Sequence, residues 1–314
     1  MTMSKTLHSG AYRHVWDNER LLSSLMIAPA ILYIAVLIGF PLVLAILYSL
    51  SSATTGDPSI SFVGLRNFIA VIQDPVFQKS LKNTFIFTVV SQMLVIVLSN
   101  ILARALLQEF KGKRIVRFLI LLPWTAPIAL GTIGWMWMLD SIFSPIDWVL
   151  RYAGLLGAPD AVLGTNPNLY WLGVPGLAMS SIIIVHTWRM LPLATVILLG
   201  GLTAIPKEIL DAAEVDGAGF WRRLFQITLP LLLPIMSIAV LFGVVFTFTD
   251  IAVVYILTQG GPFHSTQVLA SWAFFKGIES GDLAQGAAIA LFLFPVMAAA
   301  AALILRSVRR REVT

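Results

Sequence analysis

The sequence contains no cysteine and few charged residues. It has 314 residues, of which 58% are hydrophobic and 12% are charged, with four histidines. Without cysteine there can be no disulfide, no thiolate metal site and no cysteine nucleophile. The histidines stand at positions 8, 14, 186 and 264 without metal-ligand spacing, so we predict no metal site. Soluble domains carry about 25% charged residues, so the low charge content predicts a membrane protein.

Sequence signals for catalysis and nucleotide binding are also missing. No group of His, Asp and Glu suggests an active site. The nearest fragment to a phosphate-binding loop, "EFKGKRI" (109–115), lacks the first glycine and the hydroxyl of G-x-x-x-x-G-K-[ST]. Basic residues flank apolar runs and do not form a nucleic-acid patch. We therefore predict no catalytic residues, no cofactor in this chain and no nucleic-acid partner.

Long apolar runs occupy most of the chain. A transmembrane helix needs about 20 apolar residues, and six segments meet this length. We expect an all-α polytopic membrane protein, with one six-span domain over residues 21–305 between an N-terminal tail (1–20) and a basic C-terminal tail (306–314). The first run is longer than a signal-peptide core, so we expect it to be retained. The six segments are Leu21–Leu50, Asn83–Leu107, Val116–Leu139, Val174–Leu202, Ile227–Leu257 and Leu283–Leu305.

The distribution of basic residues predicts the topology. Fifteen of the 21 lysines and arginines lie in the two tails, around the second–third connection and in the polar segment before the fifth span. Five lie in the other connections, and Arg189 lies within a span. By the positive-inside rule, both termini and the polar segment face the cytoplasm.

That polar segment begins at about Pro206 and continues into the stretch "ILDAAEVDGAGFWRRLFQITLPLLLP" (209–234). It separates two apolar spans. Pro206 suits the first turn of a helix, and Glu208, Asp211 and Glu214 recur at every third position. Gly217 then permits a turn that a side chain would obstruct. The pattern predicts a helix–turn–helix elbow.

Two interpretations of the elbow compete. It could be an amphipathic hairpin that only joins two spans at the membrane surface. However, an acidic stripe is repelled by an anionic leaflet, and interfacial helices normally carry Lys and Arg on the polar face. The bare surface of Ala212 and Ala213 and the aromatic ring of Phe220 favour a protein partner.

The same segment resembles the EAA loop of ABC-importer permeases, E-A-A-x-x-D-G-A followed by an aromatic residue and I-x-L-P. Asp211 stands where the family usually has glutamate, and is one methylene shorter. Other stretches are similar to the carbohydrate-uptake branch, and to its maltose-type first permease in particular. The matching positions are Asp211, Ala212, Ala213, Asp216, Gly217, Ala218, Phe225 and Ile227–Pro230, with "FPLVLAILYSL", "FVGLRNF", "LLPWTAP" and "ILTQGGPFHST" elsewhere.

The resemblance implies a type I ABC-importer permease fold in a bacterial or archaeal cytoplasmic membrane. It implies that a coupling helix at about 206–221 docks on a separate ATPase dimer, which would hold ATP and Mg. It also implies a homologous second permease and an extracytoplasmic solute-binding protein, with Gly260, Gly261 and Pro262 as candidate docking residues for the latter. The ATPase-docking residues would be Glu208, Asp211, Ala212, Ala213, Asp216, Gly217, Ala218 and Phe220.

Candidate substrate-pathway residues are Arg189, Asp250, Trp135, Trp188 and Tyr255. Sugars stack on aromatic rings and bond to a few polar groups. Ionisable groups in spans usually face a cavity or each other, so the Arg189–Asp250 pair could contact substrate or could have an internal structural role. The tryptophans could instead belong to an interfacial belt or to helix packing.

Three function classes remain at this stage. The first is a permease subunit of a carbohydrate or polyol ABC importer. The second is an ion-coupled secondary transporter of a small polar solute, which is disfavoured by the scarcity of intramembrane acids. The third is a membrane-embedded enzyme, which lacks catalytic residues. ATP dependence of transport in vesicles distinguishes the first two.

Overall fold

The computed structural model describes residues 19–312, and the tail positions 1–18 and 313–314 lie outside the described residues. The described chain is helical, with one isolated β-bridge between Ser51 and Phe62. The α-helices are α2 (Glu19–Ile34), α3 (Phe40–Ser49), α4 (Arg66–Gln73), α5 (Pro75–Leu107), α6 (Lys113–Thr125), α7 (Ile128–Met138), α8 (Pro145–Tyr152), α9 (Pro175–Thr203), α10 (Lys207–Val215), α11 (Phe220–Arg223), α12 (Leu229–Phe248), α13 (Ala252–Thr258), α14 (Leu269–Phe274) and α15 (Leu283–Glu312); π-helical turns are η1 (Ala35–Gly39), η2 (Leu224–Thr228) and η3 (Phe275–Glu279).

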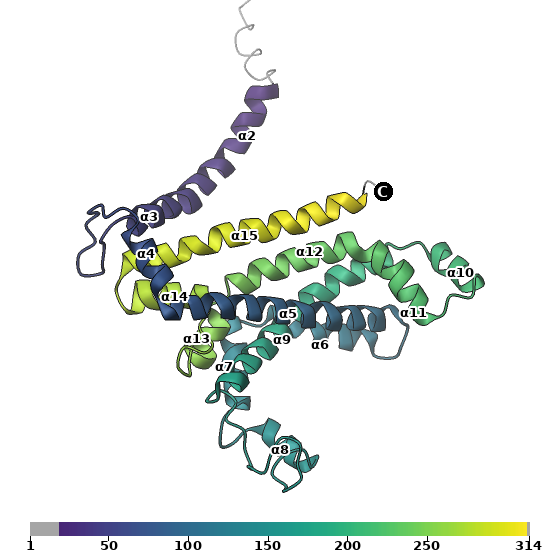
Figure 1. The fold of residues 1–314 in the computed structure, drawn as a ribbon. Helices are drawn as coiled ribbons and strands as arrows, with labels where there is room; N and C mark the ends of the chain where they lie inside the picture. Colours follow the sequence, from purple (N-terminus) through teal and green to yellow (C-terminus); the bar gives the residue numbers. More distant parts are fainter. Residues whose placement is uncertain (1–18, 313–314) are drawn as a thin grey trace, which may run out of the picture.

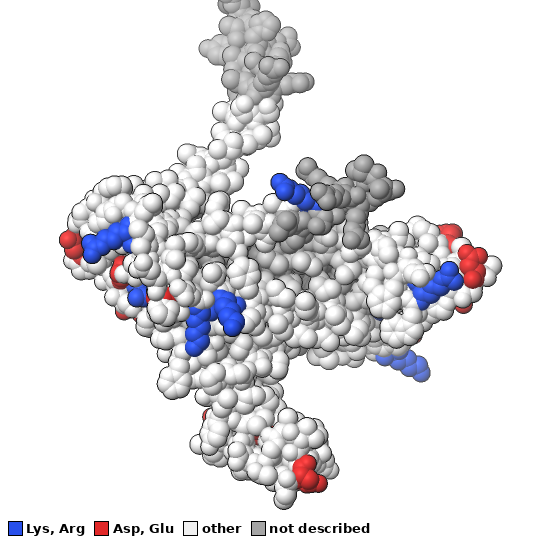
Figure 2. All heavy atoms as spheres, viewed as in Figure 1, with Lys and Arg blue, Asp and Glu red and all other residues white. Residues whose placement is uncertain are grey.

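Four long helices form the body of the molecule. α5 packs along α9, α12 packs against both, and α15 packs against α12 and α3. Figure 1 shows α10 and α11 at one end of this bundle and α4 and α14 at the other, with α8 on a projection beyond α7. We call the first of these the elbow end. On the face in Figure 2, most charged side chains lie towards the two ends of the bundle, and the surface between them is almost uncharged, as expected for a bilayer-spanning band.

Five helical stretches are long and apolar enough to cross a membrane, and a bent pair gives up to six within the described residues. The bent pair corrects the expectation of one continuous span over 116–139. α6 ends at Thr125, α7 begins at Ile128, and their axes differ by 99°. Ala126 and Pro127 are extended between them. The proline has no N–H to donate to a continuing helix, and it disfavours the helical conformation of the residue before it.

The fifth expected span, 227–257, is also interrupted. α12 ends at Phe248, and α13 begins at Ala252. Asp250 lies in the break and accepts a hydrogen bond from the backbone N–H of Val253 at 3.2 Å. A side-chain oxygen thus satisfies a donor at the start of the next helix, as capping residues do.

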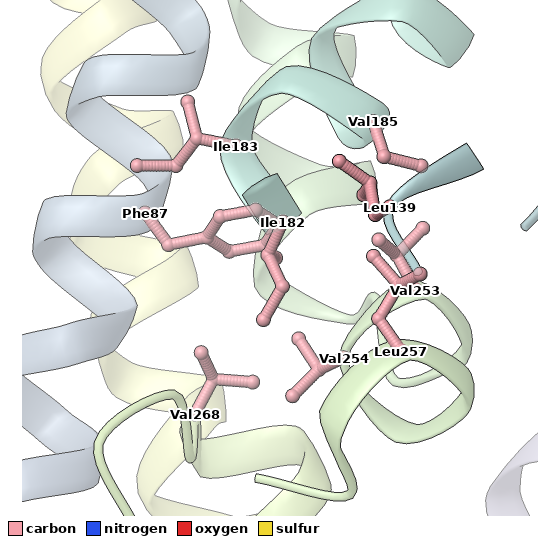
Figure 3. Packing of buried hydrophobic residues seen from close by; sticks show 9 residues of the cluster. All are labelled: Phe87, Leu139, Ile182, Ile183, Val185, Val253, Val254, Leu257 and Val268. Carbon is pink, nitrogen blue, oxygen red and sulfur yellow. The ribbon is translucent and has the colours of Figure 1, made fainter. Parts of the chain in front are cut away.

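The largest buried cluster lies where the segment after the α12–α13 break meets α5 and α9 (Figure 3). Phe87 and Ile182 are completely buried at its centre. Val253 and Val254 of α13 close the cluster from the other side, and Trp135 packs at its edge. This cluster fixes α13 against α9, and thereby fixes the position of Asp250.

Candidate functional site

A buried polar cluster joins α9 to the α12–α13 break. Oδ2 of Asp250 lies 2.7 Å from Nδ1 of His186 and 3.3 Å from Nη1 of Arg189. The other imidazole nitrogen lies 2.9 Å from the hydroxyl of Thr247, which also receives a bond from Gln92 at 3.2 Å. His186 and Asp250 are buried, and burying a charge requires partners of this kind. The structure thus brings Arg189 and Asp250 together.

Arg189 is the member of this cluster that reaches towards open space. Its side chain is 23% exposed, whereas that of Asp250 is 2% exposed. The guanidinium carbon lies 6.0 Å from the centre of the Trp124 ring. A guanidinium has five N–H donors, so one bond to Asp250 leaves donors for a polar solute. α9 continues as a helix through Pro192, so the proline does not open the helix here.

The candidate tryptophans are packed against each other. The rings of Trp135 and Trp188 meet edge to face, with centroids 5.7 Å apart. Trp188 also lies over Gly131, where an added Cβ would meet its ring at 3.5 Å. The pair therefore joins α7 to α9 across the bend that follows α6.

Tyr255 has a separate environment from the cluster around Asp250. Its hydroxyl donates to a carboxylate oxygen of Glu279 at 2.7 Å, and its ring meets Phe274 edge to face. The structure thus gives Tyr255 a contact with η3 and does not bring it into the Arg189 cluster.

The loop Thr258–Thr266 is held rigidly on the end of the bundle opposite the elbow. The hydroxyls of Thr258 and Thr266 lie 2.7 Å apart, and that of Thr266 donates to the carbonyl of Gly261 at 2.7 Å. Lys79 of α5 bonds to the carbonyl of Phe263 at 2.8 Å. Gly260 is buried, whereas the Phe263 side chain, which the sequence analysis did not select, is 88% exposed.

The polar segment forms the helix–turn–helix elbow that the sequence predicts. α10 ends in a Schellman motif: the N–H of Ala218 bonds to the carbonyl of Ala213 at 2.9 Å, and the N–H of Gly217 bonds to that of Glu214 at 3.0 Å. Gly217 has φ = +73°, a conformation that glycine adopts without strain. Arg223 of α11 then forms an ion pair with Glu214 at 2.7 Å, which ties the two arms together.

The surface of the elbow combines acids and aromatic rings. Glu208, Asp211 and Asp216 are exposed, and so is Ala212. Phe220 is 57% exposed. Ala213 and Ala218, which the sequence analysis placed among the docking residues, are buried inside the elbow in this chain. Their small side chains allow the turn to close instead.

A model of the family described as "Binding-protein-dependent transport system inner membrane component" matches residues 95–312. The chain belongs to this family. It is 32% identical over 277 residues to the trehalose/maltose transport system permease protein MalF of Thermococcus litoralis, covering 88% of this chain and 90% of that protein. It is 30% identical over 298 residues to the sulfoquinovosyl glycerol transport system permease protein SmoG of Agrobacterium fabrum, covering 94% of this chain and 92% of that protein.

A solved structure shares the permease fold. It is a bacterial ABC transporter involved in the import of the acidic polysaccharide alginate, with a TM-score of 0.77 over 95% of this chain and 98% of that chain, at 18% identity. The protein is thus a multi-pass inner-membrane permease subunit of a binding-protein-dependent ABC importer. The family assignment sets aside the ion-coupled carrier and the membrane enzyme.

Several residues of the permease's polar cluster could not be selected from sequence alone. Gln92 and Thr247 lie in apolar spans, and their only sequence signal is a polar side chain at that depth. His186 is packed against Phe87, with 4.8 Å between the ring centroids, and both of its ring nitrogens have hydrogen-bond partners. Among the described residues, no group of three or more His, Cys, Asp and Glu side chains could hold a metal ion.

Proposed function

We propose that this permease forms half of the translocation pathway for a carbohydrate or related polyol. A homologous second permease completes the pathway, an ATPase dimer drives it, and an extracytoplasmic solute-binding protein delivers the solute. Both termini and the elbow face the cytoplasm. The relatives named for trehalose/maltose and sulfoquinovosyl glycerol transport support the substrate class.

The elbow is the feature that supports the proposed docking of the ATPase dimer. It extends from the bundle (Figure 1), and its two arms are fixed by the Schellman motif and the Glu214–Arg223 ion pair. Glu208, Asp211 and Phe220 give it an exposed acidic and aromatic face. A rigid element transmits a partner's motion without dissipating it in local bending. ATP can shift the access states only through such differential contact.

Arg189 supports the proposed solute contact. Its guanidinium is partly exposed and lies beside the ring of Trp124, so a solute would find hydrogen-bond donors next to an aromatic face. Asp250 and His186 hold its position from the buried side. We assign Trp135 and Trp188 to the wall beside this site, and Tyr255 to a separate part of the pathway near Glu279.

The loop Thr258–Thr266 is the proposed docking element for the solute-binding protein. Gly260, Gly261 and Pro262 shape it, and Phe263 is the side chain that a partner would meet. Lys79 and Asn83 of α5 fix the loop to the bundle through bonds of 2.8 Å and 2.9 Å. Contact at the loop would therefore be passed directly to α5.

The elbow is tested by a matched pair of glycine variants, Gly217→Val and Gly219→Val. An added Cβ meets nothing within 4 Å at either position, but φ is +73° at Gly217 and −65° at Gly219. Valine is therefore strained only at the first position. In complexes purified in detergent, we expect the ATPase subunit to be lost from Gly217→Val and retained by Gly219→Val. Equal ATPase content in both variants and the wild type would refute the coupling role.

The orientation is tested by single cysteines, because the natural sequence has none. Val215 on the elbow is 89% exposed, and Tyr152, the last residue of α8, is 85% exposed. In intact cells, an impermeant maleimide is expected to label Tyr152→Cys and to label Val215→Cys only after permeabilisation. The opposite pattern would invert the proposed topology.

A further inference from the structure

A basic surface surrounds the α5–α6 connection at the elbow end. Lys111, Arg114 and Arg117 are exposed there. Lys113 is paired with Glu109 at 2.7 Å, so this one carboxylate offsets one of the four positive charges here. Glu109, Lys113, Arg114 and Arg117 line a hollow of about 590 Å³. This hollow offers room and positive charge for an anionic group.

An apolar groove begins at the same place. It has a volume of about 390 Å³ between α6 and α9, and Arg117 lines both the groove and the basic hollow. Leu121, Val196 and Leu199 supply the apolar lining. Leu121 and Val196 are 37% and 52% exposed, so the groove opens on the surface of the helix pair.

Arg117 lies about one helical turn into α6. It is four residues after Lys113, the first residue of α6, and four helical residues advance about 6 Å along the axis. The structure assigns its guanidinium one long bond, 3.5 Å to the carbonyl of Leu106. The remaining donors are therefore available to a phosphate.

The geometry points to a binding site for an anionic phospholipid, whose phosphate is held by Arg117 and Arg114 and whose acyl chain lies in the groove beside Gly200. Basic pockets between helices at a membrane surface bind such headgroups. The continuous groove argues against free phosphate, which would use the polar hollow alone. The site is separate from the elbow and from the Arg189 cluster, and so goes beyond the proposed transport function.

A photo-crosslinking amino acid at Val196 tests the site in the assembled complex. The complex is placed in vesicles of equal phosphatidylglycerol and phosphatidylethanolamine, and the adducts are identified by mass spectrometry. We expect phosphatidylglycerol adducts to outnumber phosphatidylethanolamine adducts by about five to one, against one to one in the bulk, since one basic residue near the surface contributes about 1 kcal/mol. The same probe at Val36, 53% exposed on the first span, is expected to report the bulk ratio.

Two substitutions test the headgroup contact and the acyl-chain groove separately. Arg117→Gln is expected to abolish the enrichment, whereas Arg306→Gln, which removes an exposed cation from α15, is expected to preserve it. At Gly200 an added Cβ meets nothing within 4 Å, so Gly200→Leu can fill the groove without a clash at that atom and is expected to lower total lipid adducts. Adducts with the second permease, or a bulk lipid ratio at Val196, would overturn the proposal.

Discussion

The first span and α9 are both long apolar helices, but they occupy opposite environments. The stretch Leu22–Ser49 is the more hydrophobic of the two, and none of its most apolar window is buried within the chain. In α9 (Pro175–Thr203), 56% of the corresponding window is buried. Figure 1 shows α2 extending away from the bundle and α9 at its centre.

The difference lies in the polar residues that each helix carries. α9 contains His186, Arg189 and Thr195, and these reduce its hydropathy. In a bilayer, polar side chains are placed towards other helices, because lipid offers them no partners. The most apolar span is therefore the one with the least contact inside its own chain. In this pair the more hydropathic helix is the exposed one, and the less hydropathic helix is the buried one.

The largest expected effect comes from removing the carboxylate of Asp250, which pairs with two side chains of α9. Asp250→Ala leaves Arg189 and His186 without their acceptor, and losing one partner of a buried pair costs about 3 kcal/mol. Thermal unfolding followed by tryptophan fluorescence measures the loss. Asp160→Ala, which changes an exposed acid on the α8 projection, is the matched control and should leave the midpoint unchanged. If both variants unfold alike, the cluster does not stabilise α9.

A smaller loss of stability is expected when a buried isoleucine is shortened than when Asp250 is removed, and a smaller one still for an exposed isoleucine. Ile182→Ala leaves a cavity in the cluster of Figure 3 and is expected to cost about 2 kcal/mol. Ile31→Ala, on a residue of α2 that is 60% exposed, is expected to cost less than about 0.5 kcal/mol, because lipid or a partner fills the space. Unfolding in detergent compares the two. Equal losses would mean that the first span is as tightly packed as α9.

The smallest expected effect concerns two glycines. An added Cβ at Gly201 of α9 would lie 2.6 Å from the side chain of Leu232 and 2.9 Å from that of Ile235, so Gly201→Ala forces these side chains of α12 to shift. The crowding outweighs the gain in helix propensity, for a net loss of about 1 kcal/mol. At Gly39 of the first span nothing lies within 4 Å, so Gly39→Ala is expected to be neutral or slightly stabilising. A stabilising Gly201→Ala would show that α9 and α12 pack loosely.

The elbow and the polar cluster were predictable to different degrees. The elbow could be read from Gly217 and the acidic spacing because its conformation is local: a glycine at positive φ and hydrogen bonds within six residues define it. The burial of Ala213 depended on how the turn closes. Arg189 and Asp250 could be selected as charges within spans, but the inclusion of Gln92 required the crossing of α5 with α12.

The sequence by itself determined the membrane class, the helical segments and the elbow, because hydropathy and turn chemistry act over short stretches of chain. Only the tertiary structure decided the 99° break after Thr125, the exposure of Phe263 and the contact of Tyr255 with Glu279. Pro127 permits the break locally, but the angle of the bend, like the other two features, depends on how these segments pack against the rest of the bundle. That packing is set by contacts between segments, which no single segment encodes.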